Sequence, residues 1–255
     1  MESGTGVPYG DLWIHELRQG TVDAFVAFLL TQVPNLRYLY LDNFTRQSAL
    51  LGMLLRSAIC EHVNYQLPDF QHLRDVYFLL ADRADREPDE TVMNAADILP
   101  FFYLPSLQKI SASIENPVSF TWPAAHPPVP SNFKSLDLTC DQGVYLEVLD
   151  LDRFTAAISH VRDTLMELTV SAHASRCGVA FSYPAVNIVG SLHQMVKFEM
   201  LRRLEIPWPL LVGFVPDTTK RLHDVIPSNI ESLVLTDDLR LHNIRLYGSG
   251  LIRLF

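Results

Sequence analysis

The chain has 255 residues, of which 48% are apolar, and its 29 acidic and 20 basic residues give a formal net charge of −9. This share of apolar residues excludes a globally disordered chain. The acidic balance argues against a general nucleic-acid binder and against a protein that docks on anionic membranes, since both need a cationic surface.

Membrane and secretory signals are not expected either. The longest apolar stretch near the start, Ala24–Leu30, is far shorter than the roughly 20 residues that span a bilayer. No basic region followed by an apolar core opens the chain, as a secretory signal would require. Cys60, Cys140 and Cys177 are odd in number and too widely spaced for a disulfide framework. We therefore expect a protein of the cytoplasm or nucleus, without a membrane partner.

Residues 1–32 are expected to form an N-terminal capping segment of one strand and one helix. Asp11–Leu17 is predicted as a starting strand. Thr21–Gln32 is predicted as a helix with Thr21 as its N-cap, because its apolar residues recur at helical spacing. Further helices are predicted over Thr45–Cys60, Glu90–Leu99, Asp152–Leu165, Ser191–Met200 and Thr218–Val225.

Between these helices a segment of the form Leu-x-x-Leu-x-Leu recurs, in degenerate form, seven times at intervals of 26 to 37 residues. Several copies follow a proline and a small polar residue, as in Pro34-Asn35 and Pro105-Ser106, which stop a helix and favour a turn. A recurring period of this kind indicates a stacked array, because one unit cannot bury its apolar face alone. The copies begin at Leu36, Leu73, Leu107, Phe133, Leu165, Leu201 and Ile230.

The order of helix, turn and strand repeats over residues 33–242 and predicts an α/β fold of about seven irregular units. Connections between parallel strands are strongly right-handed. We therefore expect a right-handed solenoid, or horseshoe, with parallel strands on the concave face and helices on the convex face. The proline-rich insertion at 117–132 is expected to cross the edge of the solenoid as a spacer. Residues 243–255 are expected to be an incomplete C-terminal unit or a tail.

The segments Val33–Leu41 (VPNLRYLYL), Leu104–Ile110 (LPSLQKI) and Pro227–Leu233 (PSNIESL) resemble leucine-rich repeats. More particularly, they resemble the degenerate repeats of fungal F-box/leucine-rich-repeat proteins. The resemblance implies a helix-backed horseshoe that presents a protein ligand, in this family a target of a ubiquitin ligase. The helical F-box module that docks the ligase adaptor normally precedes the repeats. Here the repeats begin too soon after the start for a recognisable F-box.

No pattern of residues indicates a catalytic, cofactor or metal site. The run Cys60–His62 stands at the end of a predicted helix, but it has no second ligand pair at zinc spacing. Cys140 and Asp141 lie just past a predicted strand, and His160 and His173 flank the next one. A Cys-His hydrolase therefore stays open as an alternative, although a catalytic pair would have to be in hydrogen-bond contact. We expect no enzyme, no cofactor and no metal.

Alternation along each strand is expected to send apolar residues into the core and the intervening residues to the concave face. Tyrosines gather at one end of that face, and tyrosine is enriched in interface hot spots. The alternative is a merely solvated face with Arg203 paired to Glu167 across strands. The predicted ligand-binding residues are Tyr38, Tyr40, Asp75, Tyr77, Lys109, Asp137, Glu167, Arg203 and Glu205.

Three functions are compatible with these features. The first, which we favour, is a non-catalytic protein–protein interaction module that binds a protein ligand on the concave face. The second, implied by the resemblance, is the substrate-recognition subunit of a ubiquitin ligase, with a truncated or cryptic F-box before residue 33 and the ligase adaptor as partner. The third is the Cys-His hydrolase, which alkylation of the thiols would inactivate.

Overall fold

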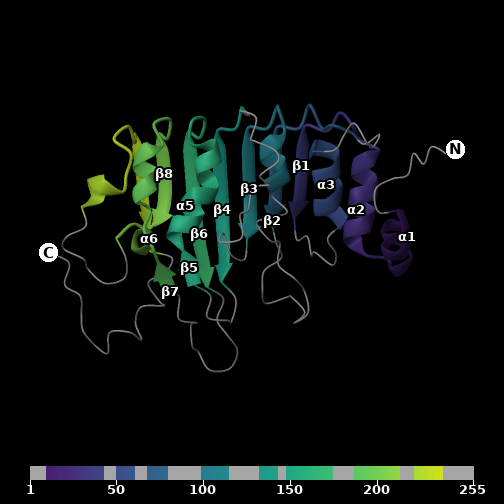
Figure 1. The fold of residues 1–255 in the computed structure, drawn as a ribbon, viewed down its shortest axis with the longest axis horizontal. Helices are drawn as coiled ribbons and strands as arrows, with labels where there is room; N and C mark the ends of the chain where they lie inside the picture. The colour runs from purple at the N-terminus through teal and green to yellow at the C-terminus, as the bar shows by residue number, and fades with distance from the viewer. Residues whose placement is uncertain are drawn as a thin grey trace, which may run out of the picture.

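The computed structural model describes residues 10–42, 50–60, 68–79, 99–114, 132–142, 148–174, 187–212 and 221–237. Over these residues the chain is α/β, as expected, and is built around one seven-stranded parallel sheet. The strands lie side by side in the order in which they occur in the chain, with helices along one face (Figure 1). They are β1 (Tyr38–Asp42), β2 (Asp75–Leu79), β3 (Lys109–Ile114), β4 (Ser135–Gln142), β6 (Glu167–Ala174), β8 (Arg203–Pro207) and β9 (Ser232–Thr236).

The connecting segments carry short helices and a second, small sheet. The small sheet pairs β5 (Val148–Asp150) with β7 (Asn187–Val189) in parallel. The α-helices are α1 (Gly10–Gln19), α2 (Val22–Thr31), α3 (Leu50–Cys60), α5 (Leu151–Ile158) and α6 (Trp208–Val212). Four 3₁₀ helices are described: η2 (Leu99–Tyr103), η4 (Ser159–Val161), η6 (His193–Lys197) and η7 (Leu222–Asp224).

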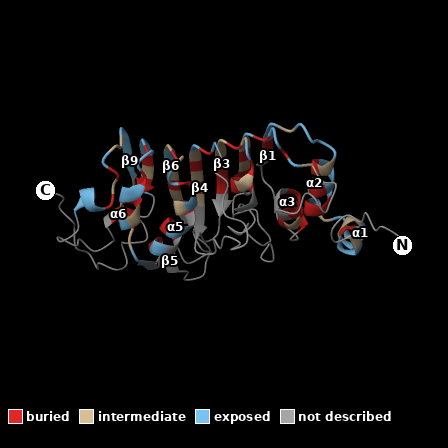
Figure 2. Cartoon of the chain, turned by 45° about the horizontal axis from the view of Figure 1, so that its top comes forward, coloured by how far each residue is buried: buried red, intermediate tan, exposed pale blue. Residues whose placement is uncertain are grey.

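The core lies between the sheet and the helices. Strand register aligns the second apolar residue of each copy into one row, in which Val76, Ile110, Leu136, Leu168 and Leu204 are all fully buried. The third apolar residue forms a parallel row that includes Phe78, Leu138 and Ile206. Figure 2 shows buried residues alternating with less buried ones along the strands. Each fully buried leucine in such rows stabilises the fold by about 1.5–3 kcal/mol relative to an exposed one.

A ladder of backbone hydrogen bonds continues the sheet beyond the amino ends of the strands. The N–H of Arg74 donates to the carbonyl of Arg37 at 2.8 Å, and the N–H of Gln108 donates to the carbonyl of Arg74 at 2.7 Å. The same bond repeats at every later strand of the seven-stranded sheet, through Lys134, Met166, Arg202 and Glu231. The residues that occupy one position of the repeat are therefore direct neighbours in space.

Two expected helices prove to be shorter 3₁₀ turns. Within Ser191–Met200 only η6 forms, and in the described part of Thr218–Val225, residues 221–225, only η7 forms. In the first case Leu192, Met195 and Phe198 are buried at intervals of three residues, and each successive N–H donates to the carbonyl three residues back. A period of three matches the 3₁₀ helix, whereas an α-helix would rotate these side chains away from a common line.

The expectation of a starting strand over Asp11–Leu17 is wrong, because these residues belong to helix α1. Trp13 and Leu17, four residues apart, both pack against the core. Gly20, at φ +79°, ends the helix, and the N–H of Thr21 donates to the carbonyl of Glu16. That pattern is a helix C-cap of the Schellman type, which favours glycine.

Helix α2 lies within the predicted range, with Thr21 at its N-cap. The Thr21 hydroxyl donates to the Glu16 carbonyl and accepts no hydrogen bond from the first turn of the helix. Helix α3 covers the later part of Thr45–Cys60, and α5 with η4 covers most of Asp152–Leu165. The insertion at 117–132, apart from Asn132, the tail at 243–255 and most of the Glu90–Leu99 prediction lie outside the described residues.

Candidate functional site

The face of the sheet opposite the helices, here called the open face, carries two rows of side chains that run across all seven strands. The strand register places the corresponding residues of neighbouring strands side by side in both rows. One reads Tyr38, Asp75, Lys109, Ser135, Glu167, Arg203 and Ser232, and the other reads Tyr40, Tyr77, Ser111, Asp137, Thr169, Glu205 and Val234. The nine predicted ligand-binding residues therefore do lie on one continuous surface.

Three tyrosines form an aromatic cluster at the N-terminal end of this surface. Tyr38 and Tyr40 are 60% and 59% exposed, although both lie within a strand. The rings of Tyr40 and Tyr77 are in contact, with centroids 5.2 Å apart and planes inclined by 37°. The ammonium group of Lys109 lies 5.5 Å from the centre of the Tyr77 ring, within the range of a cation–π interaction. These contacts constrain the rings of Tyr40 and Tyr77, while Tyr38 and Tyr40 leave much of their surface open to a ligand.

The middle of the open face is polar and internally hydrogen-bonded. The Ser111 hydroxyl, which is nearly buried, donates to Asp137 Oδ2 at 3.0 Å across β3 and β4. The Ser135 hydroxyl donates to Glu167 Oε2 at 3.1 Å across β4 and β6. Asp137 and Glu167, two of the predicted ligand-binding residues, thus already accept hydrogen bonds from serines. These bonds fix the direction in which the other lone pairs of the two carboxylates point.

At the C-terminal end of the open face, Arg203 does not form the ion pair with Glu167 that was considered as an alternative. Arg203 contacts Glu205 of its own strand, with 3.5 Å between Nη2 and Oε2, rather than Glu167 of the neighbouring strand. The Arg203 side chain is 54% exposed. An exposed ion pair of this length stabilises by at most about 1 kcal/mol. A ligand could therefore replace this pair at little cost.

A second polar cluster, which the sequence did not reveal, lies on the helix-covered side beside a groove of about 500 Å³. Ser191 Oγ lies 2.7 Å from His193 Nδ1, and Asp152 Oδ1 lies 3.8 Å from the same nitrogen. A nucleophile relay needs the hydroxyl and the carboxylate on opposite ring nitrogens. Here His193 Nε2 instead contacts the side chain of Gln194 at 2.6 Å. The cluster orients the imidazole and is not arranged as a relay.

This cluster depends on one glycine. Gly190 has φ +76°, and a Cβ at this position would lie 2.6 Å from Asp152 Oδ2. The backbone N–H of Ser191 donates to Asp152 Oδ1 at 3.3 Å, which ties the start of α5 to the end of β7. In the sequence, Gly190 is the one residue that could have pointed to this cluster. Its partner Asp152 lies 38 residues earlier in the chain, so no local sequence pattern connects the two.

The residues of the hydrolase alternative lie on neighbouring elements. The β4–β6 register pairs Cys140 with Ala172 and Asp141 with His173. His160 lies in η4, behind the sheet, and desolvation by partial burial lowers its pKa from the ordinary value of 6.5. The side chains of Cys140 and His173, and the residues Glu61 and His62, are outside the described part of the structure.

Among the described residues, no group of three or more His, Cys, Asp or Glu side chains is placed to hold a metal ion. Within the same ranges, no helix has the length and apolar character needed to cross a bilayer. Comparisons of the chain with protein-family models, with curated proteins and with solved structures found nothing that matches it.

Proposed function

We propose that this chain is a non-catalytic protein-interaction module of the leucine-rich-repeat type, and that a protein ligand binds the open face of its sheet. The observation that carries the proposal is the aromatic cluster of Tyr38, Tyr40 and Tyr77 at one end of that face. Two of these tyrosines expose about three-fifths of their surface. Large aromatic side chains held on a rigid strand lose little conformational entropy on binding, and this makes them effective interface anchors.

The repeat assignment is supported by the regular advance of the chain. Each unit adds one parallel strand beside the preceding one, in chain order, and repeats the same backbone bond at the entry to the strand. The proposal is that these units form a right-handed solenoid, with the open face on its concave side and the helices on its convex side. Such a scaffold depends on nearest-neighbour contacts and offers an extended surface to a partner.

The matched test removes two tyrosines without disturbing the core. The double variant Tyr38→Ala, Tyr77→Ala should weaken binding of captured partners by about tenfold or more, as expected for hot-spot tyrosines. Its unfolding free energy should change by about 1 kcal/mol or less, because Tyr38 is exposed and Tyr77 is only partly buried. Val196→Ala, a 44% exposed position in η6, serves as the control.

The measurement is quantitative affinity capture of the tagged wild type and both variants from native cells, followed by binding of the recovered partner in purified form. Loss of the same partners from both variants, or their retention by the tyrosine variant, would count against the proposal. Unfolding of the tyrosine variant would also contradict it, because these side chains would then be structural.

A second candidate, the substrate-recognition subunit of a ubiquitin ligase, is favoured by one observation at the N-terminal end. Helix α2 exposes Val22, Phe25 and Leu29, at 44%, 48% and 61%, on positions spaced three and four residues apart. Phe28 is also 47% exposed. An apolar stripe of this kind suits docking of a helical adaptor. Capture of a ligase adaptor and cullin by the wild type, but not by Phe25→Ser, Leu29→Ser, would support this function.

A further inference from the structure

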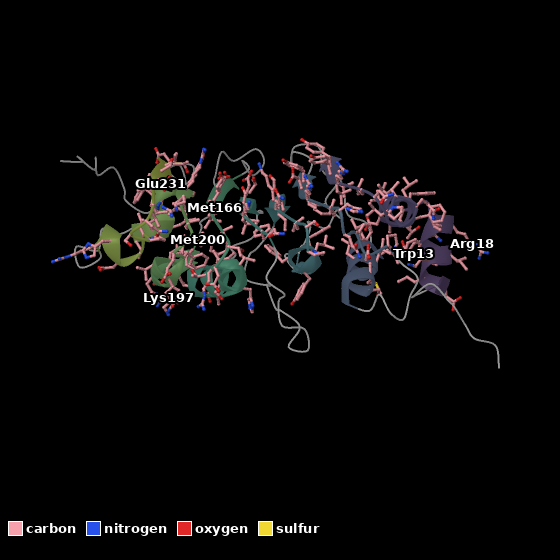
Figure 3. The ribbon with its side chains drawn as sticks, turned by 90° about the horizontal axis from the view of Figure 1, so that it is seen from above. Trp13, Arg18, Met166, Lys197, Met200 and Glu231 are labelled. Atoms are coloured by element: carbon pink, nitrogen blue, oxygen red, sulfur yellow. The ribbon has the colours of Figure 1, made fainter. Side chains whose placement is uncertain are left out.

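A row of cations, here called the cation row, runs along the sheet at the amino ends of the strands. The backbone ladder makes Arg37 and Arg74 direct neighbours, with Gln108 between Arg74 and Lys134. Adjacent strands lie about 4.8 Å apart, so the two arginines are one step apart and Lys134 lies about 10 Å further along. Figure 3 looks down on this end of the molecule, where two later members of the same ladder, Met166 and Glu231, are labelled.

The side chains of all three cations of the row are exposed. Arg37, Arg74 and Lys134 make no side-chain hydrogen bond or ion pair within the parts of the chain that the structure describes. Asp75 follows Arg74 directly and does not lie within ion-pair distance of either arginine. Two guanidinium groups on adjacent strands repel each other. The chain has nine more acidic than basic residues, so the cation row is a local positive patch on a protein of negative net charge.

The ladder also contains an internal comparison. Arg202 occupies the same repeat position on the way into β8, and its Nη1 lies 2.8 Å from Glu231 Oε1 on the next step of the ladder. The row can therefore satisfy an arginine with a carboxylate placed one strand away. Among the residues that the structure describes, no carboxylate takes that place beside Arg37 or Arg74.

We infer that the cation row binds an acidic segment of the protein ligand, whose carboxylates take the place that Glu231 occupies beside Arg202. The inference rests on the proposed function and specifies the partner. Arg37 and Arg74 directly precede Tyr38 and Asp75, the first open-face residues of β1 and β2, so the backbone of the cation row borders the open face at the amino ends of these strands. A ligand that anchors an aromatic or aliphatic residue on the tyrosine cluster would place acidic residues on the cation row. The large negative charge of the chain favours an acidic protein segment over nucleic acid, because nucleic acid would meet repulsion beyond the row.

The test uses a fluorescein-labelled peptide of ten residues that alternates Glu and Ala, titrated by anisotropy at low ionic strength. Arg37→Gln, Arg74→Gln should weaken its binding about tenfold, while the matched variant Arg202→Gln should change it by less than about twofold. Raising the salt concentration should weaken wild-type binding and narrow the difference between the variants.

Three outcomes would overturn the inference. One is undetectable binding of the peptide to the wild type, and another is equal binding by the wild type and the Arg37, Arg74 variant. The third is binding of a single-stranded oligonucleotide of equal charge more than tenfold tighter than the peptide, which would point to nucleic acid. None of them depends on the tyrosine variant. If the tyrosine variant keeps its partners while the arginine variant loses the peptide, the proposed function fails and the cation row stands as a separate anionic site.

Discussion

Replacing one buried leucine, Leu168→Ala in β6, tests the two-faced sheet on which the binding surface depends. Leu168 is 0% exposed, and its register neighbours Leu136 and Leu204 are 0% exposed as well. Because rigid strands hold both neighbours, the surroundings cannot collapse fully into the space left by the lost methyl groups. We therefore expect a loss of about 3–4 kcal/mol in the free energy of unfolding, in the middle of the range for a buried Leu→Ala change.

The control is the next residue of the same strand, Thr169→Ala, whose side chain lies on the open face and is only partly buried. It should cost about 0.5 kcal/mol or less. Urea denaturation followed by circular dichroism measures both changes, and thermal melting should show a drop in Tm of roughly 6–16 °C for the leucine variant. Equal costs at the two positions, or a leucine cost below about 1 kcal/mol, would refute the alternation of core and open face.

Three smaller effects follow from single contacts. Asp137→Ala removes the acceptor of the nearly buried Ser111 hydroxyl, so it should cost about 1 kcal/mol in urea denaturation, with part recovered when Ser111→Ala is added. Gly190→Ala and Gly20→Ala both force alanine to positive φ and should each cost about 1–2 kcal/mol. Gly190→Ala should cost more, because its Cβ meets a carboxylate whereas Gly20 is open. Partial burial lowers the pKa of His160, so the unfolded chain binds more protons below pH 6.5 and stability falls as the pH falls. His160→Gln should flatten that decline in Tm measured between about pH 7 and pH 5.

The sheet could be predicted from the sequence because the same apolar pattern recurs in the segment that forms each strand. The Leu-x-x-Leu-x-Leu pattern predicts the strand and the register of its residues, and it predicts the buried side of the earlier strands. In β9, however, Leu233 and Leu235 are 38% and 48% exposed. The helices were harder to predict, since their type depends on how the connection fits over the sheet. From the sequence alone, the apolar residues Leu192, Met195 and Phe198 are compatible with an α-helix. The structure shows that all three are buried, and their spacing of three residues fits a 3₁₀ helix. Asp11–Leu17 was misread because a short apolar stretch does not distinguish strand from helix.

The site was predictable only where it follows the repeat. The positions of the open-face residues could be predicted from the alternation of side chains along each strand. The ion pair of Arg203 with Glu205 on its own strand could not, because it depends on side-chain rotamers that no sequence pattern encodes. The cation row has no signal in the sequence, because it uses one residue per repeat and no run of Lys or Arg marks it in the chain. The Asp152–His193 cluster joins residues that only the fold brings together.

Site-specific photo-cross-linking tests the central claim, binding of a protein on the open face, most directly. A photoreactive phenylalanine analogue would replace Tyr40 in one tagged version of the chain and Val196, on η6, in another. Both positions are exposed, so both can label a partner that contacts them. We predict that irradiation in native cells links the same protein to the Tyr40 position and not to the Val196 position. Cross-links at Val196 alone, or the same cross-links at both positions, would contradict the account.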